Sequence, residues 1–286
     1  MPKRLLTRVV VDSTSSLLPE HIGELPLSVV PLQLTVNDQI FEDGTELTTE
    51  DFYTRITVAG VNTSTSAPSP AAFEASFTAD KTDVLCITVS SQFSATYDVA
   101  RMAADNCQSS DPAQRIRLLD SATAGGALGL IALAAARAAK EGETLDRVFE
   151  IAQITASRVH FIGTLETVEY LYRGGRIPRV ASWAVSVLNI KPVLAIEPGQ
   201  GKIKMMARPR SKRKAIGIIL DSIAVNVGDK PLHVIVMHAA RLDEATALMA
   251  QIQTRFECVE SLTGPFTPVI GAHTGPGLLG VAFYHG

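Results

Sequence analysis

Three times in the first half of the chain, a continuous run of β-branched and aliphatic residues ends in small polar residues and then a helical pattern. The runs are RVVVD, DVLCITV and RIRLLD, and the polar residues after them are 13–16, 90–91 and 121. Apolar runs that alternate with helices are typical of a parallel sheet covered on both faces. Ligands of such sheets bind beyond the carboxyl ends of the strands. The sequence therefore predicts an α/β fold with a hydroxyl-lined crevice at that edge.

The stretch NTSTSAPSPAAF, residues 62–73, is a fourth junction of this kind, although the strand before it is poorly defined. It contains four successive hydroxyl residues, 63–66, ahead of Pro70, and Ser69 is placed to cap the helix that begins there. For an isolated run of Ser and Thr, a solvated loop is the alternative. Because the other junctions end in the same way, we expect this run to contribute to a site.

Composition and cysteine usage favour a globular protein of a reducing compartment, which we expect to be the cytoplasm. The chain has 286 residues, of which 46% are hydrophobic and 19% charged, so disorder is disfavoured. Its three cysteines lie far apart without metal-ligand spacing, which argues against a disulfide framework. The start, MPKRLLTRVVVD, predicts a first strand rather than a signal peptide.

One uncharged stretch, residues 121–136, ends at Arg137 and contains three glycines. A helix that crosses a bilayer needs about 20 predominantly apolar residues. The stretch is shorter than that, so it predicts a helix buried inside the protein.

From about residue 164 the pattern changes, and we expect a domain boundary near residue 160. The two predicted domains are residues 1–160 and 161–286. The second begins with a helix, a glycine break at 174–175 and a second helix. A hairpin with PGQG, residues 198–201, at its turn comes next, followed by a strand–helix unit and a glycine-rich end.

Positive charge is concentrated between Tyr170 and Leu220. This segment has eleven Lys or Arg residues and one acid, Glu197, whereas the whole chain has a net charge of −3. Such a segment indicates an anionic ligand or an acidic partner, and a solvated helix face is the alternative. Nucleic acid is disfavoured, because aromatic residues are not interleaved with the basic run RPRSKRK and the whole chain is acidic.

Several catalytic and cofactor motifs are absent. The sequence has no G-x-S-x-G, no P-loop and no H-E-x-x-H. GPGLLG, residues 275–280, leaves no room for the helix that a dinucleotide site requires. We predict no metal and no cofactor. A Ser hydrolase stays open as the alternative, with Ser94 or Ser66 as nucleophile and His273 as base, but no carboxylate stands out to orient the histidine.

Seven stretches lie in order between Val9 and Gly280: VVVDSTSSLLPE, TSAPSPAAF, SSQFSATYDVA, LLDSATAGGALGL, TVEYLYRGGRI, NIKPVLAIEPGQGKI and GAHTGPGLLG. Together they resemble the DegV family of fatty-acid-binding proteins, the FakB subunits of bacterial fatty acid kinases. Two departures are visible: Ala67 stands where the family usually has Gln, and Ala95 where it usually has Gly.

The resemblance implies a two-domain α/β protein with a largely parallel N-terminal sheet and a smaller C-terminal domain. A long-chain fatty acid would lie between the domains, in a tunnel with the Ala/Leu-rich residues 124–136 as walls. The residues that match the head-group site are Thr65, Ser66, Ser94, Ala95 and His273.

The resemblance also implies that the chain alone has no catalytic activity. A separate ATP-dependent kinase would phosphorylate the bound carboxylate to an acyl-phosphate for phospholipid synthesis. Arg176 and Lys191 fall in family motifs within the basic segment, so we expect them to face the phosphoryl group or the kinase. Transient contact with a membrane surface is a further expectation.

Overall fold

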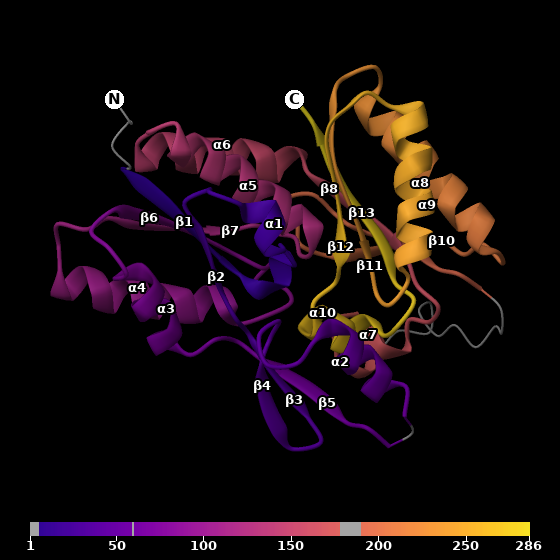
Figure 1. Cartoon of the computed structure of the whole chain (residues 1–286), viewed down its shortest axis with the longest axis horizontal. Coiled ribbons are helices and arrows are strands. Elements are labelled where there is room, and N and C mark those ends of the chain that lie inside the picture. The colour runs from indigo at the N-terminus through magenta and orange to yellow at the C-terminus, as the bar shows by residue number, and fades with distance from the viewer. Residues whose placement is uncertain (1–5, 59, 178–189) are drawn as a thin grey trace.

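A computed structural model describes residues 6–58, 60–177 and 190–286, and its strands form three sheets (Figure 1). The first sheet is entirely parallel, which confirms the α/β prediction. Its strands, in spatial order, are β2 (Leu27–Val30), β1 (Thr7–Asp12), β6 (Asp83–Thr88) and β7 (Ile116–Asp120).

Helices cover both faces of this sheet, as its continuous apolar strands predict. Val10 packs with α3 (Pro70–Phe77) and α4 (Thr96–Ser110), whereas Val9 and Val11 face the opposite side. That side is covered by α5 (Gly126–Lys140) and α6 (Leu145–Arg158) (Figure 1). The cap predicted for α3 is confirmed, because Ser69 Oγ accepts a hydrogen bond of 3.2 Å from the amide of Ala72.

The hydroxyl run 63–66 is itself a strand, which corrects the prediction of a junction that follows a strand of the parallel sheet. It forms β5 (Thr63–Ser66) in a small antiparallel sheet with β3 (Gln33–Val36) and β4 (Gln39–Glu42). Threonine is β-branched and favours extended backbone, and here it alternates with serine, so one face of the strand is threonine and the other serine. A two-residue turn with positive φ at Asn37 and Asp38 joins β3 to β4.

The third sheet has six strands of mixed direction. Helices α8 (Lys212–Val227) and α9 (Leu242–Arg255) cover one face, and α5 packs on the other. In spatial order the strands are β10 (Ile203–Ala207), β9 (Val193–Ile196), β8 (His160–Thr164), β13 (Leu279–His285), β11 (Leu232–His238) and β12 (Cys258–Pro265).

Helix α5 lies between the two large sheets and is almost entirely buried, as predicted for residues 121–136. A Cβ on Gly126 would lie 2.4 Å from Ile235 of the third sheet, and one on Gly129 would lie 3.0 Å from the carbonyl oxygen of Ser15 beside the first. Glycine therefore allows this helix to approach both sheets closely.

The shorter helices are η1 (Ser13–Ser15), α1 (Pro19–Ile22), α2 (Thr49–Ile56), α7 (Glu169–Arg173) and α10 (Pro268–Thr274). The PGQG turn is confirmed between β9 and β10. The second helix predicted after the glycine break falls at residues 178–189, outside the described part of the chain. Strand β8 begins at His160, and the division into domains at residue 160 stays a prediction. In the described ranges, none of the helices has the length and apolar character that crossing a bilayer requires.

Candidate functional site: a pocket between the two large sheets

A pocket lies where the carboxyl ends of the parallel strands meet the third sheet and helix α10. Most of its lining is apolar, including Phe161, Leu165, Leu194, Ile196, Ile203 and Leu278. Its polar lining residues are Thr14, Thr65, Ser94, Arg176, His273 and Thr274. They come from η1, β5, the segment before α4, the segment after α7, and α10.

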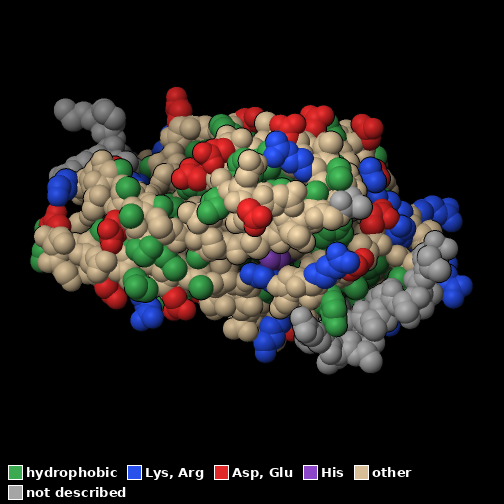
Figure 2. All heavy atoms as spheres, turned by 90° about the horizontal axis from the view of Figure 1, so that it is seen from below, with side chains coloured by type: hydrophobic (Ala, Val, Ile, Leu, Met, Phe, Trp, Pro, Cys, Tyr) green, Lys and Arg blue, Asp and Glu red, His purple; other side chains and the backbone are tan. Residues whose placement is uncertain are grey.

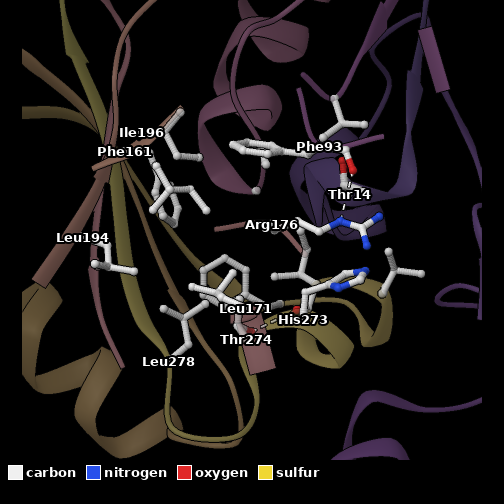
Figure 3. A pocket seen from close by; sticks show the side chains of 18 of the residues that line it. Thr14, Phe93, Phe161, Leu171, Arg176, Leu194, Ile196, His273, Thr274 and Leu278 are labelled. Carbon is white, nitrogen blue, oxygen red and sulfur yellow. Dashed lines mark hydrogen bonds between the residues drawn. The ribbon is translucent and has the colours of Figure 1, made fainter. Parts of the chain in front are cut away.

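Polar and apolar side chains are separated within the pocket. Figure 3 shows Thr14, Arg176 and His273 on one side, and Leu194, Ile196 and Leu278 on the other. The Thr274 hydroxyl donates to the carbonyl of Ile270 in its own helix, so it does not add to the polar cluster. This separation suits an amphipathic ligand with one polar end and a long apolar part.

Thr65 and His273 are 208 residues apart in the chain and are in direct hydrogen-bond contact. Thr65 Oγ1 lies 2.7 Å from His273 Nε2. Strand β5 pairs Thr65 with the buried Leu34, and α10 places His273 on the pocket side. The structure thus brings together two of the predicted head-group residues.

Burial keeps His273 neutral. Its pKa is lowered to about 4, because burial disfavours the imidazolium and the nearby Arg176 charge adds to this. Within the described ranges, Nδ1 is buried without a hydrogen-bond partner. A buried ring N–H that lacks an acceptor costs more free energy than a buried unprotonated ring nitrogen that lacks a donor. Because Nδ1 has no partner, we assign the proton to Nε2. Nε2–H then donates to Thr65, and the Thr65 hydroxyl proton is free to donate into the pocket.

Ser94 precedes Ala95, the N-cap of helix α4, and lines the pocket. Its hydroxyl is 2.8 Å from that of Thr96 and accepts a hydrogen bond of 3.3 Å from the Thr96 amide. Ala95 was predicted to contact the ligand, but it is exposed and outside the lining. Its φ of −75° is open to any residue, which explains why alanine replaces the family's glycine without strain.

Arg176 lies among the polar residues that line the pocket, beside His273 and Thr14 (Figure 3). The guanidinium donates to two carbonyl oxygens, that of Phe93 at 3.1 Å and that of Gly174 at 2.6 Å. Among the described residues no carboxylate charge acts on its guanidinium. Burial lowers its pKa. A half-buried cation without a counterion favours a bound anion.

Two other predicted site residues do not reach the pocket. Ser66 is exposed and donates to the Gln33 side chain at 3.3 Å, because successive residues of a strand face opposite sides. Lys191 is paired with Glu166, which also accepts from Lys212 at 3.4 Å. Because a neighbouring carboxylate already balances Lys191, the structure does not support a role for it at the anion.

The predicted tunnel wall at residues 124–136 is largely incorrect. Of these residues, only Ala124 and Gly125 line the pocket, and helix α5 after them is packed in the core between the sheets. The apolar walls come mainly from the third sheet and the loops beside it. Local composition could not distinguish a buried helix from a ligand-facing one.

Thr14 is a pocket residue that the sequence analysis did not single out. Its hydroxyl and its amide both donate to Asp12, at 2.5 and 3.0 Å, and Asp12 also accepts from the Val89 amide. Burial raises the pKa of Asp12 to about 6. The signal was present, since Thr14 belongs to the hydroxyl cluster that follows the first strand.

The hydroxyls and the histidine do not form a hydrolase triad. His273 contacts Thr65 rather than Ser94 or Ser66, and no described carboxylate orients its Nδ1. With a pKa of about 4, it is a weak general base at neutral pH. In the described ranges, no cluster of His, Cys, Asp and Glu could hold a metal ion.

Comparison with known proteins identifies the family. Residues 7–286 match the model described as "Uncharacterised protein, DegV family". The chain belongs to the DegV family. A DegV domain-containing protein of Streptomyces coelicolor is 32% identical over 278 residues, which cover 96% of each chain.

Solved structures of other DegV proteins share the whole fold. One from Thermus thermophilus, described as showing fatty acid binding, has a TM-score of 0.89 and 27% identity, with 98% and 99% of the two chains covered. One from Thermotoga maritima, described as revealing a fatty acid binding function, has a TM-score of 0.86 and 25% identity, with 99% and 100% covered. The α/β architecture of this DegV protein is thus a known one.

Proposed function

We propose that this DegV protein binds a long-chain fatty acid, with the carboxylate among Thr65, Ser94, Arg176 and His273. The observation that carries the proposal is the pocket itself, which places an unpaired half-buried arginine at one side and aliphatic walls at the other. The fatty acid binding described for two DegV relatives supports the same ligand class.

The head-group residues supply complementary interactions for a carboxylate. The Thr65 hydroxyl, held by His273, donates one hydrogen bond, and the Ser94 hydroxyl is placed to donate another. Arg176 supplies the positive charge. Hydrogen bonds to a charged group each contribute about 1.5–3 kcal/mol.

The apolar walls provide most of the affinity. A chain of about 14 methylene groups that leaves water contributes on the order of 11 kcal/mol before the costs of association and ordering. The hydroxyls and Arg176 therefore determine the orientation of the ligand more than the total binding energy.

The proposal extends to phosphorylation of the bound carboxylate by a separate ATP-dependent kinase. Figure 2 shows a hollow in the face that carries α7 and α10, in which histidine atoms are visible between Lys or Arg side chains. A head group near such an opening is accessible to a second protein. An acyl-phosphate carries nearly two negative charges and requires more positive charge than a carboxylate. We therefore expect Arg176 to stabilise both the bound carboxylate and the bound acyl-phosphate.

Native mass spectrometry of the purified chain tests the ligand class. We expect a bound mass that corresponds to a fatty acid and that is lost after delipidation and regained on addition of palmitate. A ligand-free mass after gentle purification, together with no uptake of palmitate, would contradict the proposal. Uptake of an acyl ester followed by its turnover would favour the hydrolase alternative.

The kinase step has its own test in Arg176→Gln, which keeps a hydrogen-bonding side chain and removes the charge. With a DegV-coupled kinase and labelled ATP, we expect acyl-phosphate formation to fall by more than tenfold, with a smaller loss of palmitate affinity. The exposed Arg173, paired with Glu169, provides the control variant Arg173→Gln. Wild-type rates in Arg176→Gln would remove this residue from the phosphoryl step.

A further inference from the structure

The Thr65–His273 contact joins two segments that pack against each other only through tertiary structure. Thr65 lies on β5, an edge strand of the small sheet. His273 lies on α10, a helix of seven residues. So short a helix has little stability of its own, so its position must be fixed by neighbouring groups.

Asp43, which follows β4, is almost completely buried at 3% exposure and bonds to the first turn of α10. Its Oδ1 accepts a hydrogen bond of 3.0 Å from the amide of Val269. Val269 and His273 are four residues apart, so they lie on the same face of the helix, and both line the pocket. A bond at Val269 therefore fixes the turn that precedes His273.

The other oxygen of Asp43 reaches the segment after β1. Oδ2 accepts a hydrogen bond of 2.6 Å from the Ser13 hydroxyl, which itself accepts from the amide of Leu32 at 3.1 Å. The Asp43 amide donates to the Leu32 carbonyl at 2.8 Å. Leu32 immediately precedes β3, which pairs with β5. In this pairing Leu34 lies opposite Thr65.

One carboxylate thus bonds both to α10 and to the segments that position β5. We propose that Asp43 is a positioning residue of the head-group site, whose carboxylate ties α10 to the base of the small sheet and so holds His273 against Thr65. Asp43 does not line the pocket, so it acts through the geometry of that pair. This role deepens the proposed function and rests on it for the ligand.

Two substitutions test the role. Asp43→Ala removes both acceptor oxygens. Asp43→Asn keeps the size of the side chain but has one acceptor oxygen, so either the Val269 amide or the Ser13 hydroxyl loses its acceptor. Gln114→Ala is a matched control, because Gln114 is similarly buried and donates to three backbone carbonyls at the opposite, amino-terminal end of the parallel sheet.

The first readout is the ¹⁵N spectrum of the His273 imidazole in the ligand-free full chain. We expect Asp43→Ala to shift the Nε2 and Nδ1 signals toward a mixture of tautomers and to raise the pKa of His273 toward 6.5. Asp43→Asn should shift them less. Gln114→Ala, although destabilised, should give the wild-type spectrum.

The second readout is the dissociation constant for palmitate. We expect it to rise about tenfold in Asp43→Ala and about threefold in Asp43→Asn, and to stay within twofold of the wild type in Gln114→Ala. Wild-type His273 signals and wild-type affinity in a folded Asp43 variant would overturn the proposal, as would equal changes in Gln114→Ala. If the wild type itself does not bind palmitate, the fatty acid proposal fails, and the His273 spectra still decide the role of Asp43.

Discussion

At the scale of single residues, the polar side of the pocket depends on which side of strand β5 a hydroxyl faces. Thr65 lines the pocket and contacts His273, whereas the adjacent Ser66 faces solvent. Arg176 supplies the positive charge at the same place. Strand geometry therefore separates neighbouring hydroxyls of one run, so that Thr65 lines the pocket and Ser66 is exposed.

Thr65→Val keeps the branched shape of the side chain and removes its hydroxyl. We expect palmitate binding to weaken by about 1.5–3 kcal/mol, because a hydrogen bond to the carboxylate is lost and His273 loses its acceptor. Ser66→Ala is the matched control and should change affinity by less than twofold. Displacement of a fluorescent fatty acid measures both. Equal losses in the two variants would show that β5 does not present Thr65 to the ligand.

His273 should make stability depend on pH. Its pKa is about 4 in the folded chain and near 6.5 when unfolded. The unfolded state therefore binds more protons between pH 6.5 and 4, so the free energy of unfolding falls as the pH is lowered through this window, by at most about 1.4 kcal/mol per pH unit. In His273→Gln, this contribution to the fall in unfolding free energy should be absent.

Urea unfolding of the wild type and His273→Gln at pH 7, 6 and 5 measures the effect as a difference. The raised pKa of Asp12, about 6, acts in the opposite direction, because a folded state that holds the proton longer becomes more stable as the pH is lowered. Since both proteins contain Asp12, its contribution cancels in the difference. If the free energies of unfolding of the two proteins depend on pH in the same way, the lowered pKa of His273 is contradicted.

At the scale of elements, the β9–β10 hairpin closes the pocket against the parallel sheet. It contributes Leu194, Ile196 and Ile203 to the lining. At its turn, Gly201 has a φ of +64°, and a Cβ there would lie 2.1 Å from the hydroxyl oxygen of Ser90. The turn thus packs directly on the segment after β6, at a distance that only glycine allows.

Gly201→Ala should move this hairpin away from the sheet. We expect a loss of about 2–3 kcal/mol in unfolding free energy, from strain at positive φ together with the contact to Ser90, and a weaker affinity for palmitate. Gly199→Ala is the matched control, since Gly199 has a φ of +68° with nothing within 4 Å, and it should lose about 1 kcal/mol with unchanged affinity. Equal effects in both variants would show that the contact with Ser90 has no role.

At the scale of the whole molecule, helix α5 packs on both large sheets. The pocket is lined by strands of the third sheet and by segments that follow the strands of the parallel sheet. The lining runs from Thr14 in η1 to Leu278 just before β13, so a ligand in this pocket would contact segments far apart in the sequence and stabilise the folded chain as a unit. The comparison with other DegV structures, which cover nearly all of the chain, is consistent with one shared architecture.

Palmitate should therefore raise the melting temperature of the delipidated chain. At a free concentration one hundred times the dissociation constant, the expected gain is about 2.7 kcal/mol, which corresponds to a shift of about 5–10 °C. Hexadecanol has the same tail without the charge, leaves Arg176 without a counterion, and should give a clearly smaller shift. Scanning calorimetry compares the two ligands. Equal shifts would mean that the carboxylate is not recognised.

Several features of the fold depend only on residues that are neighbours in the sequence. The parallel βα units, the Ser69 cap, the buried helix after residue 121 and the PGQG turn all follow from local periodicity and turn chemistry. The ordered motifs also predicted the family. Each of these depends on backbone preferences or side-chain patterns within one short segment, so a single sequence carries the information.

The contacts between residues far apart in the sequence depend on the tertiary structure. The contact between Thr65 and His273 spans 208 positions, and the place of Arg176 beside it depends on how the loop after α7 packs against the segment before α4. No local pattern marks Asp43 as the link between α10 and the small sheet. Such contacts result from the packing of the two large sheets on α5 and of the small sheet on α10, which buries and hydrogen-bonds segments far apart in the chain.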